Sequence, residues 1–318
     1  METIIAATDF SRPALNALKY AAALTAELNA QLLLVHVVEV PLTPLQVPLT
    51  IADFDEITAC ATEQLDELKE QLSFYTNDLI TIHTEVKYGY TETALKNLCG
   101  EVQPIAVVVG LSEHAATRLF LGHTALRIVQ YIEYPVLIIP EKAVFSGIKN
   151  IVIASDLEHI RETTAIEFIR NWLGLFHLSP YVLHVCTNGD LKENTIDSNI
   201  TLAKDLAEFK PKFHSLYNKN MEDGIFNFLE QKKSDLLLVV PGKYSFFKEL
   251  FHTSHTKQLI LHSHLPVLAV PSYRFRGLKG EKQVNGEHHS KPCNGCDGLC
   301  CSKDQRLENQ IDEAHSPS

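Results

Sequence analysis

The sequence predicts an α/β protein in which two tandem domains each carry a parallel sheet of five strands. Short apolar runs, of the kind shown by strands buried on both faces, alternate with amphipathic helical segments through residues 2–271. The order of segments also occurs twice, because residues 151–156 (IVIASD) match residues 4–9 (IIAATD) position for position. A chain of 318 residues is long enough for two well-buried cores. We therefore expect domains at 1–143 and 147–271.

The first repeat is expected to contain five strands and four helices. Ser11 can cap the first helix, and Pro13 is tolerated in its first turn. Residues 40–49 (VPLTPLQVPL) hold three prolines and no charge, which predicts an apolar surface loop. The expected strands are residues 2–8, 31–38, 80–87, 105–109 and 135–139, and the expected helices begin at Ser11 and cover 57–72, 91–98 and the segment after Thr124.

The second repeat follows a hinge at residues 144–147 and is shorter than the first. Its polar segment 187–199 is expected to be a loop, and the helix after it is brief. The expected strands are residues 151–155, 182–186, 212–217, 235–240 and 267–269, with helices near 165–173, 201–209 and 222–231. From residue 272 onward the sequence is charged and aperiodic, so residues 272–318 are expected to be a disordered tail.

Residues 105–140 have the layout of an anion site. An apolar strand ends at Gly110, a loop leads to Gly122, and Thr124 precedes a helical pattern. Glycine lets the backbone approach a phosphate closely, and the first free N–H groups of a helix point at it. The second repeat keeps the strands but has Pro241 and Thr253 in place of the two glycines. We therefore expect at most one phosphate site, in the first repeat.

These segments together resemble a tandem, two-domain bacterial universal stress protein over residues 2–271. In that family each domain is Rossmann-like, of the adenine nucleotide alpha hydrolase-like kind, and binds ATP, AMP or no nucleotide. The family's phosphate motif is Gly, two residues, Gly, nine residues, Gly, then Ser or Thr. Here Gly110 matches the first glycine, Glu113 stands at the second, and Gly122 comes one residue early, with Thr124 offering the hydroxyl.

The resemblance also implies the residues around the adenosine. Asp9, preceded by Thr8, matches the family's acidic residue at the end of the first strand, and Val38 matches the hydrophobic residue that covers the adenine. The implied nucleotide site is Thr8, Asp9, Val38, Gly110, Gly122 and Thr124.

Two interpretations of the glycine loop are open. The carboxylate of Glu113 opposes a polyphosphate unless a Mg²⁺ ion bridges them. Alternatively, the loop has diverged and keeps its glycines for turn geometry alone. The expectation is a non-catalytic protein that binds ATP or AMP as a sensor or adaptor. The alternatives are a nucleotide-free interaction module, which would use its sheet edges and residues 40–49, and a slow ATP hydrolase.

The motifs of phosphate-cleaving and serine enzymes are missing from the sequence. Gly242-Lys243 lacks the upstream glycine and the hydroxyl of a G-x-x-x-x-G-K-[ST] loop. Ser112 lies in GLSEH, which departs from the G-x-S-x-G elbow, and we expect an ordinary loop serine. We therefore expect no enzymatic activity.

Charge excludes two classes of partner. The formal net charge is −11, and residues 272–318 hold seven basic and seven acidic side chains, so the folded part carries the whole excess of acid. This argues against a nucleic-acid surface or a basic membrane-binding face. No apolar run approaches the roughly 20 residues of a membrane span, and the N-terminus has no secretion pattern. Cys60, Cys99 and Cys186 are expected to be buried thiols, so the expected location is the cytoplasm.

The tail offers a second candidate site, because Cys293, Cys296, Cys300 and Cys301 supply four thiolates within nine residues. Zinc or another soft metal suits such ligands. The alternative is a tail of free or redox-active thiols.

The histidines are expected to be structural. His36 and His184 occupy equivalent strand positions and are expected in the core, with hydrogen bonds to neighbouring strands. A further cluster is expected at the surface or at helix ends rather than on zinc: His252, His255, His262 and His264.

The last strand of each repeat is expected at a sheet edge, as in the family that the chain resembles. An exposed apolar edge leaves N–H and C=O groups unpaired. Because a short hinge tethers the two edges, residues 136–139 and 267–269 are predicted to pair antiparallel within one chain, as an intramolecular pseudo-dimer.

Overall fold

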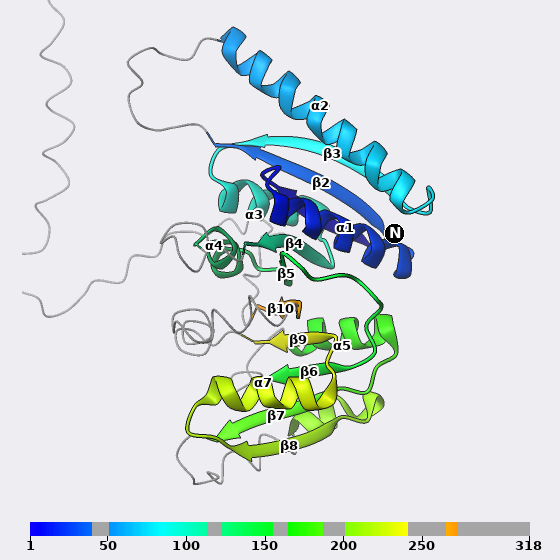
Figure 1. The fold of residues 1–318 in the computed structure, drawn as a ribbon, viewed down its shortest axis with the longest axis vertical. Coiled ribbons are helices and arrows are strands. Elements are labelled where there is room, and N and C mark those ends of the chain that lie inside the picture. The colour runs from blue at the N-terminus through cyan, green and yellow to red at the C-terminus, as the bar shows by residue number, and fades with distance from the viewer. Residues whose placement is uncertain (40–50, 113–122, 155–164, 187–200, 241–264, 272–318) are drawn as a thin grey trace, which may run out of the picture. The chain divides into compact units, whose positions relative to one another are not determined.

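The computed structural model describes residues 1–39, 51–112, 123–154, 165–186, 201–240 and 265–271 (Figure 1). The first repeat consists of β1 (Thr3–Thr8), α1 (Arg12–Glu27), β2 (Gln31–Val38), α2 (Ile51–Tyr75), β3 (Thr81–Tyr88), α3 (Thr91–Val102), β4 (Ala106–Leu111), α4 (His123–Tyr131) and β5 (Val136–Pro140). The described part of the second contains β6 (Ile151–Ala154), α5 (Ala165–Phe176), β7 (Tyr181–Cys186), the short 3₁₀ helix η3 (Ala207–Phe209), β8 (Lys212–Tyr217), α7 (Met221–Lys232), β9 (Leu236–Val239) and β10 (Val267–Ala269).

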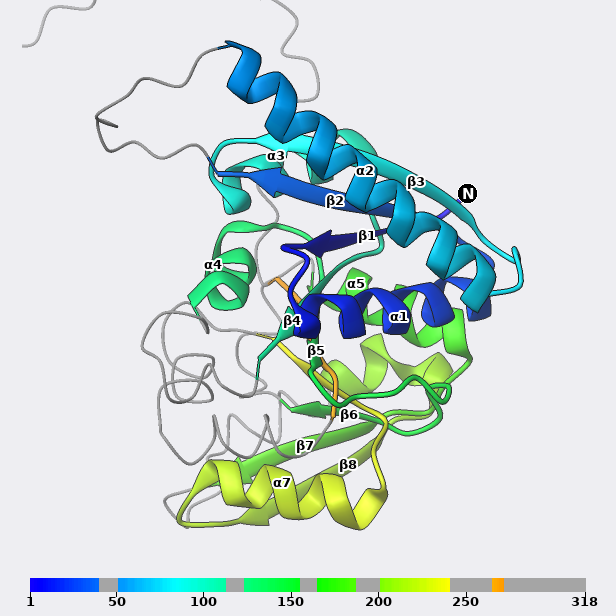
Figure 2. The ribbon, with the colours of Figure 1, turned by 45° about the horizontal axis from the view of Figure 1, so that its top comes forward.

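The predicted α/β class is confirmed. The strands form one ten-stranded sheet in the order β3-β2-β1-β4-β5-β10-β9-β6-β7-β8. Within each half every strand pair is parallel, and both halves have the same internal order. Parallel strands need crossover connections, which explains why helices separate them in the sequence. Figure 1 shows the first half running from β3 to β5 and the second from β10 to β8, and Figure 2 shows the labelled strands of the two halves, β1 to β5 and β6 to β8, from a second direction.

The two halves join at β5 and β10, which pair antiparallel as predicted. Leu137 lies opposite Leu268 at the centre of this pairing, with Ile138 opposite Val267 and Val136 opposite Ala269. All of these side chains are fully buried or nearly so. The pairing therefore removes both apolar edges that the sequence left unmatched.

A core layer covers each face of the sheet, and each layer includes residues of both halves. One layer holds side chains of α1, α2 and α5, including Leu18, Leu65 and Trp172. The other holds side chains of α3, α4 and α7, including Leu95, Ile128 and Phe228. Helices on both faces explain why the strands are continuous apolar runs.

Two local expectations need correction, both on α2. The helix begins at Ile51, earlier than expected, and Ile57 is 38 % exposed although it was assigned to the apolar stripe. Cys60 was expected to be buried and is exposed. The buried face of α2 follows Ala61, Leu65 and Leu72, and Cys60 lies off that face.

The other two folded-part cysteines are less exposed than Cys60. Cys99 on α3 is buried, and burial raises the pKa of its thiol to about 12. Cys186, at the end of β7, is half-buried. None of the described helices has the length and apolarity that a membrane crossing needs.

Candidate functional site

A cavity of about 220 Å³ lies at the carboxyl ends of β1 and β4. β1 pairs with β2 on one side and with β4 on the other, so the chain leaves β1 in one direction and returns on its other side. This reversal of strand order is the topological switch point, the place where open α/β sheets bind ligands. The connection between β4 and α4, residues 113–122, lies outside the described residues.

The cavity has an apolar floor and a polar rim. The floor is formed by Ala7, Val35, Val37, Val109, Ala125 and Ile128. The rim carries the hydroxyl groups of Thr8, Ser11, Thr91, Ser112 and Thr124, and the carboxylate of Asp9. Among the described lining residues Asp9 is the one charged side chain. Such walls suit a flat apolar group with hydroxyl or amino substituents.

The turn between β1 and α1 forms one wall of the cavity. Backbone N–H groups of this turn donate hydrogen bonds to side chains of the same turn. Oγ1 of Thr8 accepts from the backbone N–H of Phe10 at 3.0 Å, and Oδ1 of Asp9 accepts from the N–H of Ser11 at 3.0 Å. Ser11 caps α1 by accepting from the N–H of Ala14 at 3.4 Å, and Pro13 has no N–H to offer. Because these donors are engaged, the start of α1 has little left for an anion. The start of α4, next to Thr124, is the better place.

Gly110 has a packing role that the sequence did not suggest. A Cβ atom there would lie 2.6 Å from the carbonyl oxygen of Pro13 and 2.8 Å from the nitrogen of Ala14. The first turn of α1 therefore rests directly on the backbone of β4. Turn geometry does not explain this glycine, because its φ is not in the left-handed region. Gly110 lets the helix approach the strand, and it also lines the cavity.

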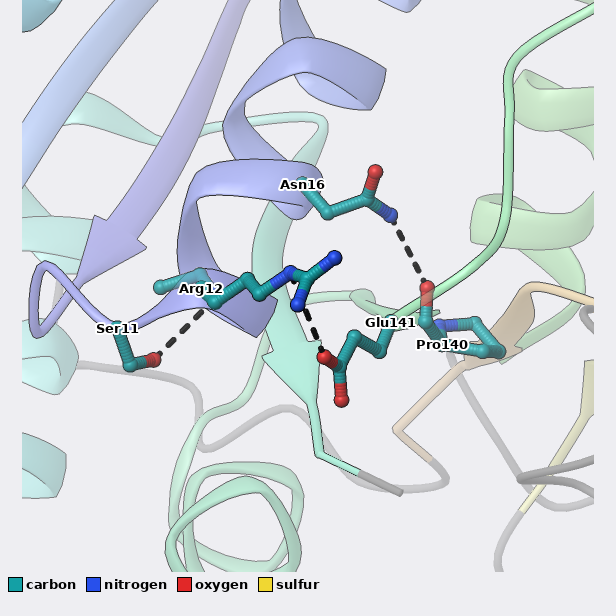
Figure 3. Close-up of polar contacts among 6 residues, drawn as sticks. Ser11, Arg12, Asn16, Pro140 and Glu141 are labelled. Carbon is teal, nitrogen blue, oxygen red and sulfur yellow. Dashed lines mark hydrogen bonds and ion pairs between the residues drawn. The ribbon is translucent and has the colours of Figure 1, made fainter. Parts of the chain in front are cut away.

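The first turn of α1 is tied to the end of β5 (Figure 3). Nδ2 of Asn16 donates to the carbonyl oxygens of Pro140 at 3.1 Å and Ala143 at 2.9 Å. Nε of Arg12 lies 3.9 Å from a carboxylate oxygen of Glu141. The cavity wall is thus anchored to the segment that leads into the second repeat.

Helices α3 and α4 line the other side of the cavity, and an ion pair joins them. Arg127 of α4 contacts Glu92 of α3, and the hydrogen bond to this carboxylate raises the pKa of the guanidinium. Oγ1 of Thr91 donates to a carboxylate oxygen of Glu39 at 2.7 Å. The rim therefore carries more acid than base among its described residues, which disfavours a bare polyphosphate.

Four of the residues implied by the resemblance meet at this cavity: Thr8, Asp9, Gly110 and Thr124. Val38 does not line it, whereas Val35 and Val37 do. Successive side chains of a strand point to opposite faces, so the floor takes the odd-numbered valines. Gly122 and Glu113 lie outside the described residues.

Sequence reasoning missed three hydroxyl groups of the rim. Ser11 was noted only as a helix cap, Ser112 only as a loop residue, and Thr91 only as a helix start. Each of them follows the carboxyl end of a parallel strand, β1, β3 or β4, and that position was the available signal.

Several predicted features lie outside the described residues. These are the tail cysteines Cys293, Cys296, Cys300 and Cys301, the histidines His252, His255, His262 and His264, and the apolar loop 40–49. Within the described ranges, no group of three or more acidic, cysteine and histidine side chains could hold a metal ion.

Comparison with known proteins identifies the first repeat. Residues 1–140 match the model of the universal stress protein family. No curated protein matches the chain in sequence.

Solved structures share the fold across both repeats. A universal stress protein from Archaeoglobus fulgidus DSM 4304 is 15% identical, with a TM-score of 0.62 over 85% of this chain and 96% of that one. A putative universal stress protein from Pseudomonas aeruginosa UCBPP-PA14 is 13% identical, with a TM-score of 0.51 over 85% of this chain and 93% of that one. A universal stress protein family protein from Arabidopsis thaliana, solved with AMP bound, is 17% identical over 43% of this chain and 90% of that one, with a TM-score of 0.31. At such identities the structures show the fold alone, and the family model gives the assignment: residues 1–140 of this chain are a domain of the universal stress protein family.

Proposed function

We propose that this chain is a non-catalytic universal stress protein of the cytoplasm that binds an adenine nucleotide, AMP or ATP, in the cavity of its first repeat. It would act as a sensor or adaptor whose surface responds to the bound ligand. One observation carries the proposal. Four residues of the site that the family resemblance implies, Thr8, Asp9, Gly110 and Thr124, line one cavity at the switch point of the sheet.

The walls match the parts of a nucleotide. The apolar floor around Val35 and Val37 suits the face of a purine ring. The carboxylate of Asp9 can accept a hydrogen bond from a ribose hydroxyl or an exocyclic amine. One of its oxygens, Oδ1, also accepts a hydrogen bond from the backbone N–H of Ser11. The start of α4, beside Thr124, suits a phosphate group.

Because the site is acidic, its affinity for a nucleotide should depend on the number of phosphate groups. With Asp9 on the rim and no basic side chain among the described lining residues, each added phosphate increases repulsion. A Mg²⁺ ion reverses that sign. We expect AMP to bind without Mg²⁺ and ATP to need it.

The absence of catalysis is part of the proposal. Phosphoryl transfer needs a lysine or arginine on the transferred group and carboxylates for Mg²⁺. The described lining residues supply one carboxylate and no lysine. The competing hypothesis is a slow ATP hydrolase, and incubation with ATP and Mg²⁺ followed by nucleotide chromatography separates the two, with unchanged ATP as the expected result.

The second competing hypothesis is a nucleotide-free interaction module. Calorimetric titration of the full chain with adenosine, AMP and ATP, with and without Mg²⁺, distinguishes it from the proposal. Mass spectrometry of ligand released from denatured protein provides an independent check. If titration gives no heat and the denatured protein releases no nucleotide, the hypothesis of nucleotide binding is rejected.

A matched pair of variants places the ligand. Val37→Phe fills the floor of the cavity, while Val38→Phe adds the same ring at the next residue, which does not line it. We expect Val37→Phe to abolish binding and Val38→Phe to leave it nearly unchanged, with both proteins folded. The opposite result would move the adenine to the position of Val38 that the family resemblance implies.

A further inference from the structure

His36 contacts the turn that forms one wall of the cavity but does not line the cavity itself. It lies on β2, half-buried, directly opposite Thr8 of β1 in the register of the sheet. Nδ1 of its ring is 2.8 Å from the carbonyl oxygen of Thr8. A carbonyl oxygen can only accept, so Nδ1 carries the proton and donates it.

The same ring contacts Phe10, whose backbone is unusual. Phe10 has a φ of 62°, in the left-handed region that bulky residues rarely enter. Its ring packs against the imidazole of His36, with centroids 4.4 Å apart and planes inclined by 35°. Strained backbone of this kind persists only where the surroundings hold it.

His36 therefore holds the turn at two points, with Asp9 between them. The first is the carbonyl group of Thr8, and the second is the ring of Phe10. The hydrogen bonds from Phe10 N–H to Thr8 and from Ser11 N–H to Asp9 depend on the same conformation. With Phe10 in the ordinary right-handed region, Ser11 and the start of α1 would take another direction from Asp9, and the Ser11 N–H would no longer meet the Asp9 carboxylate.

We infer that His36 is a positioning residue: its Nδ1–H and its ring hold the strained turn that presents Thr8 and Asp9 to the cavity. The inference rests on the proposed function for the identity of the ligand, although the hold on the turn is independent of any ligand. It adds to the site a residue that neither touches the cavity nor belongs to the loop between β4 and α4.

The second repeat provides an internal control. His184 occupies the equivalent place on β7 and is also half-buried. The residue at the place of Thr8 in this repeat, Ser155, lies outside the described residues, and His184 itself lies on a strand that is not part of the first repeat's cavity. A change at His184 therefore reports the general cost of altering such a histidine, without changing the cavity in the first repeat.

Two variants of the full chain distinguish the contribution of the Nδ1–H donor of His36 from that of its ring. His36→Asn places an amide N–H where Nδ1 stood and removes the ring, whereas His36→Phe keeps a ring against Phe10 and removes the donor. Loss of one buried hydrogen bond corresponds to about a fivefold to tenfold change in an equilibrium constant. We expect His36→Phe to weaken AMP binding by about that factor, and His36→Asn to bind within about threefold of the parent. His184→Phe should leave AMP affinity unchanged.

Hydrogen exchange of the Phe10 and Ser11 amides tests the hold on the turn without a ligand. Protection of both amides should fall in His36→Phe and persist in His36→Asn and His184→Phe. If the parent protein binds no AMP, the proposed function fails, and the exchange data still decide whether His36 holds the turn. Unchanged protection and affinity in His36→Phe would overturn the inference. Equal loss of affinity in His184→Phe would do so as well, because the effect would then be one of general stability.

Discussion

At the scale of single residues, close packing and a left-handed residue fix the backbone of the cavity wall. Gly110 and the first turn of α1 are in direct contact, and Phe10 is held in the left-handed region beside them. The polar side chains nearby stabilise the turn, since Thr8, Asp9 and Ser11 each accept a hydrogen bond from a backbone N–H group. A ligand therefore meets groups whose positions are fixed before it binds.

Gly110→Ala should destabilise the protein by about 1–3 kcal/mol, the usual cost of overpacking. The new Cβ would meet Pro13 and Ala14 backbone at under 3.0 Å, so α1 must shift away from β4. Gly100→Ala is the matched control, because Gly100 lies within α3 with open space around its Cβ direction. That change should stabilise by about 0.5–1 kcal/mol through helix propensity. Urea unfolding of both variants checks the difference, and equal stability would show that α1 does not rest on Gly110.

At the scale of elements, α1 connects the cavity to the junction between the repeats. Its first turn forms a cavity wall, its N-terminal half packs on Gly110 of β4, and Asn16 holds the end of β5. Because β5 is the strand that pairs with β10, a shift of α1 on ligand binding would reach the second repeat directly. The ion pair between Lys96 of α3 and Glu133, two residues after the end of α4, has an N–O distance of 3.0 Å and an exposed lysine, so we expect it to contribute at most about 1 kcal/mol.

Asn16→Leu should cost about 1–3 kcal/mol, because the carbonyl groups of Pro140 and Ala143 would lose their donor in a partly buried place. Asn97→Leu on α3 is the control, since Asn97 is exposed and a surface change there should stay within about 0.5 kcal/mol. Urea denaturation gives both values. A cost for Asn16→Leu no larger than that of the control would mean that these two hydrogen bonds contribute no net stability.

At the scale of the whole molecule, the two repeats share their cores. Residues Met1–Phe275 form one compact unit, and both core layers contain side chains from the two halves. Nε1 of Trp172 on α5 also donates to the carbonyl oxygen of Ile105, at 3.3 Å, across the boundary between repeats. Neither half can lose its structure without exposing apolar surface of the other.

We therefore expect a single cooperative thermal transition for this unit, seen by calorimetry and by tryptophan fluorescence at one temperature. Val136→Lys places a charge at a position of β5 that is 1 % exposed, so it should lower that temperature for the unit as a whole. Two separate transitions, or a variant that melts only the first repeat, would show that the halves are independent.

The sequence by itself determined the order of elements, the duplication and the pairing of β5 with β10. Apolar runs and helical periodicity are local, and two copies of one pattern support each other. It also determined the place of the cavity, since strands such as β1 and β4 must end at the same edge of a parallel sheet.

Tertiary structure alone decided which side chains meet. Local patterns could not show that Gly110 contacts α1, that Val37 rather than Val38 lines the floor, or that Cys60 faces solvent. Each of these depends on which face a helix or strand turns toward an element that is distant in the sequence. The same holds for Phe10, which has a positive φ that phenylalanine by itself does not favour and a ring contact with His36 on another strand. Contacts between distant segments arise only when the chain is folded, so a pattern of neighbours along the chain does not contain them.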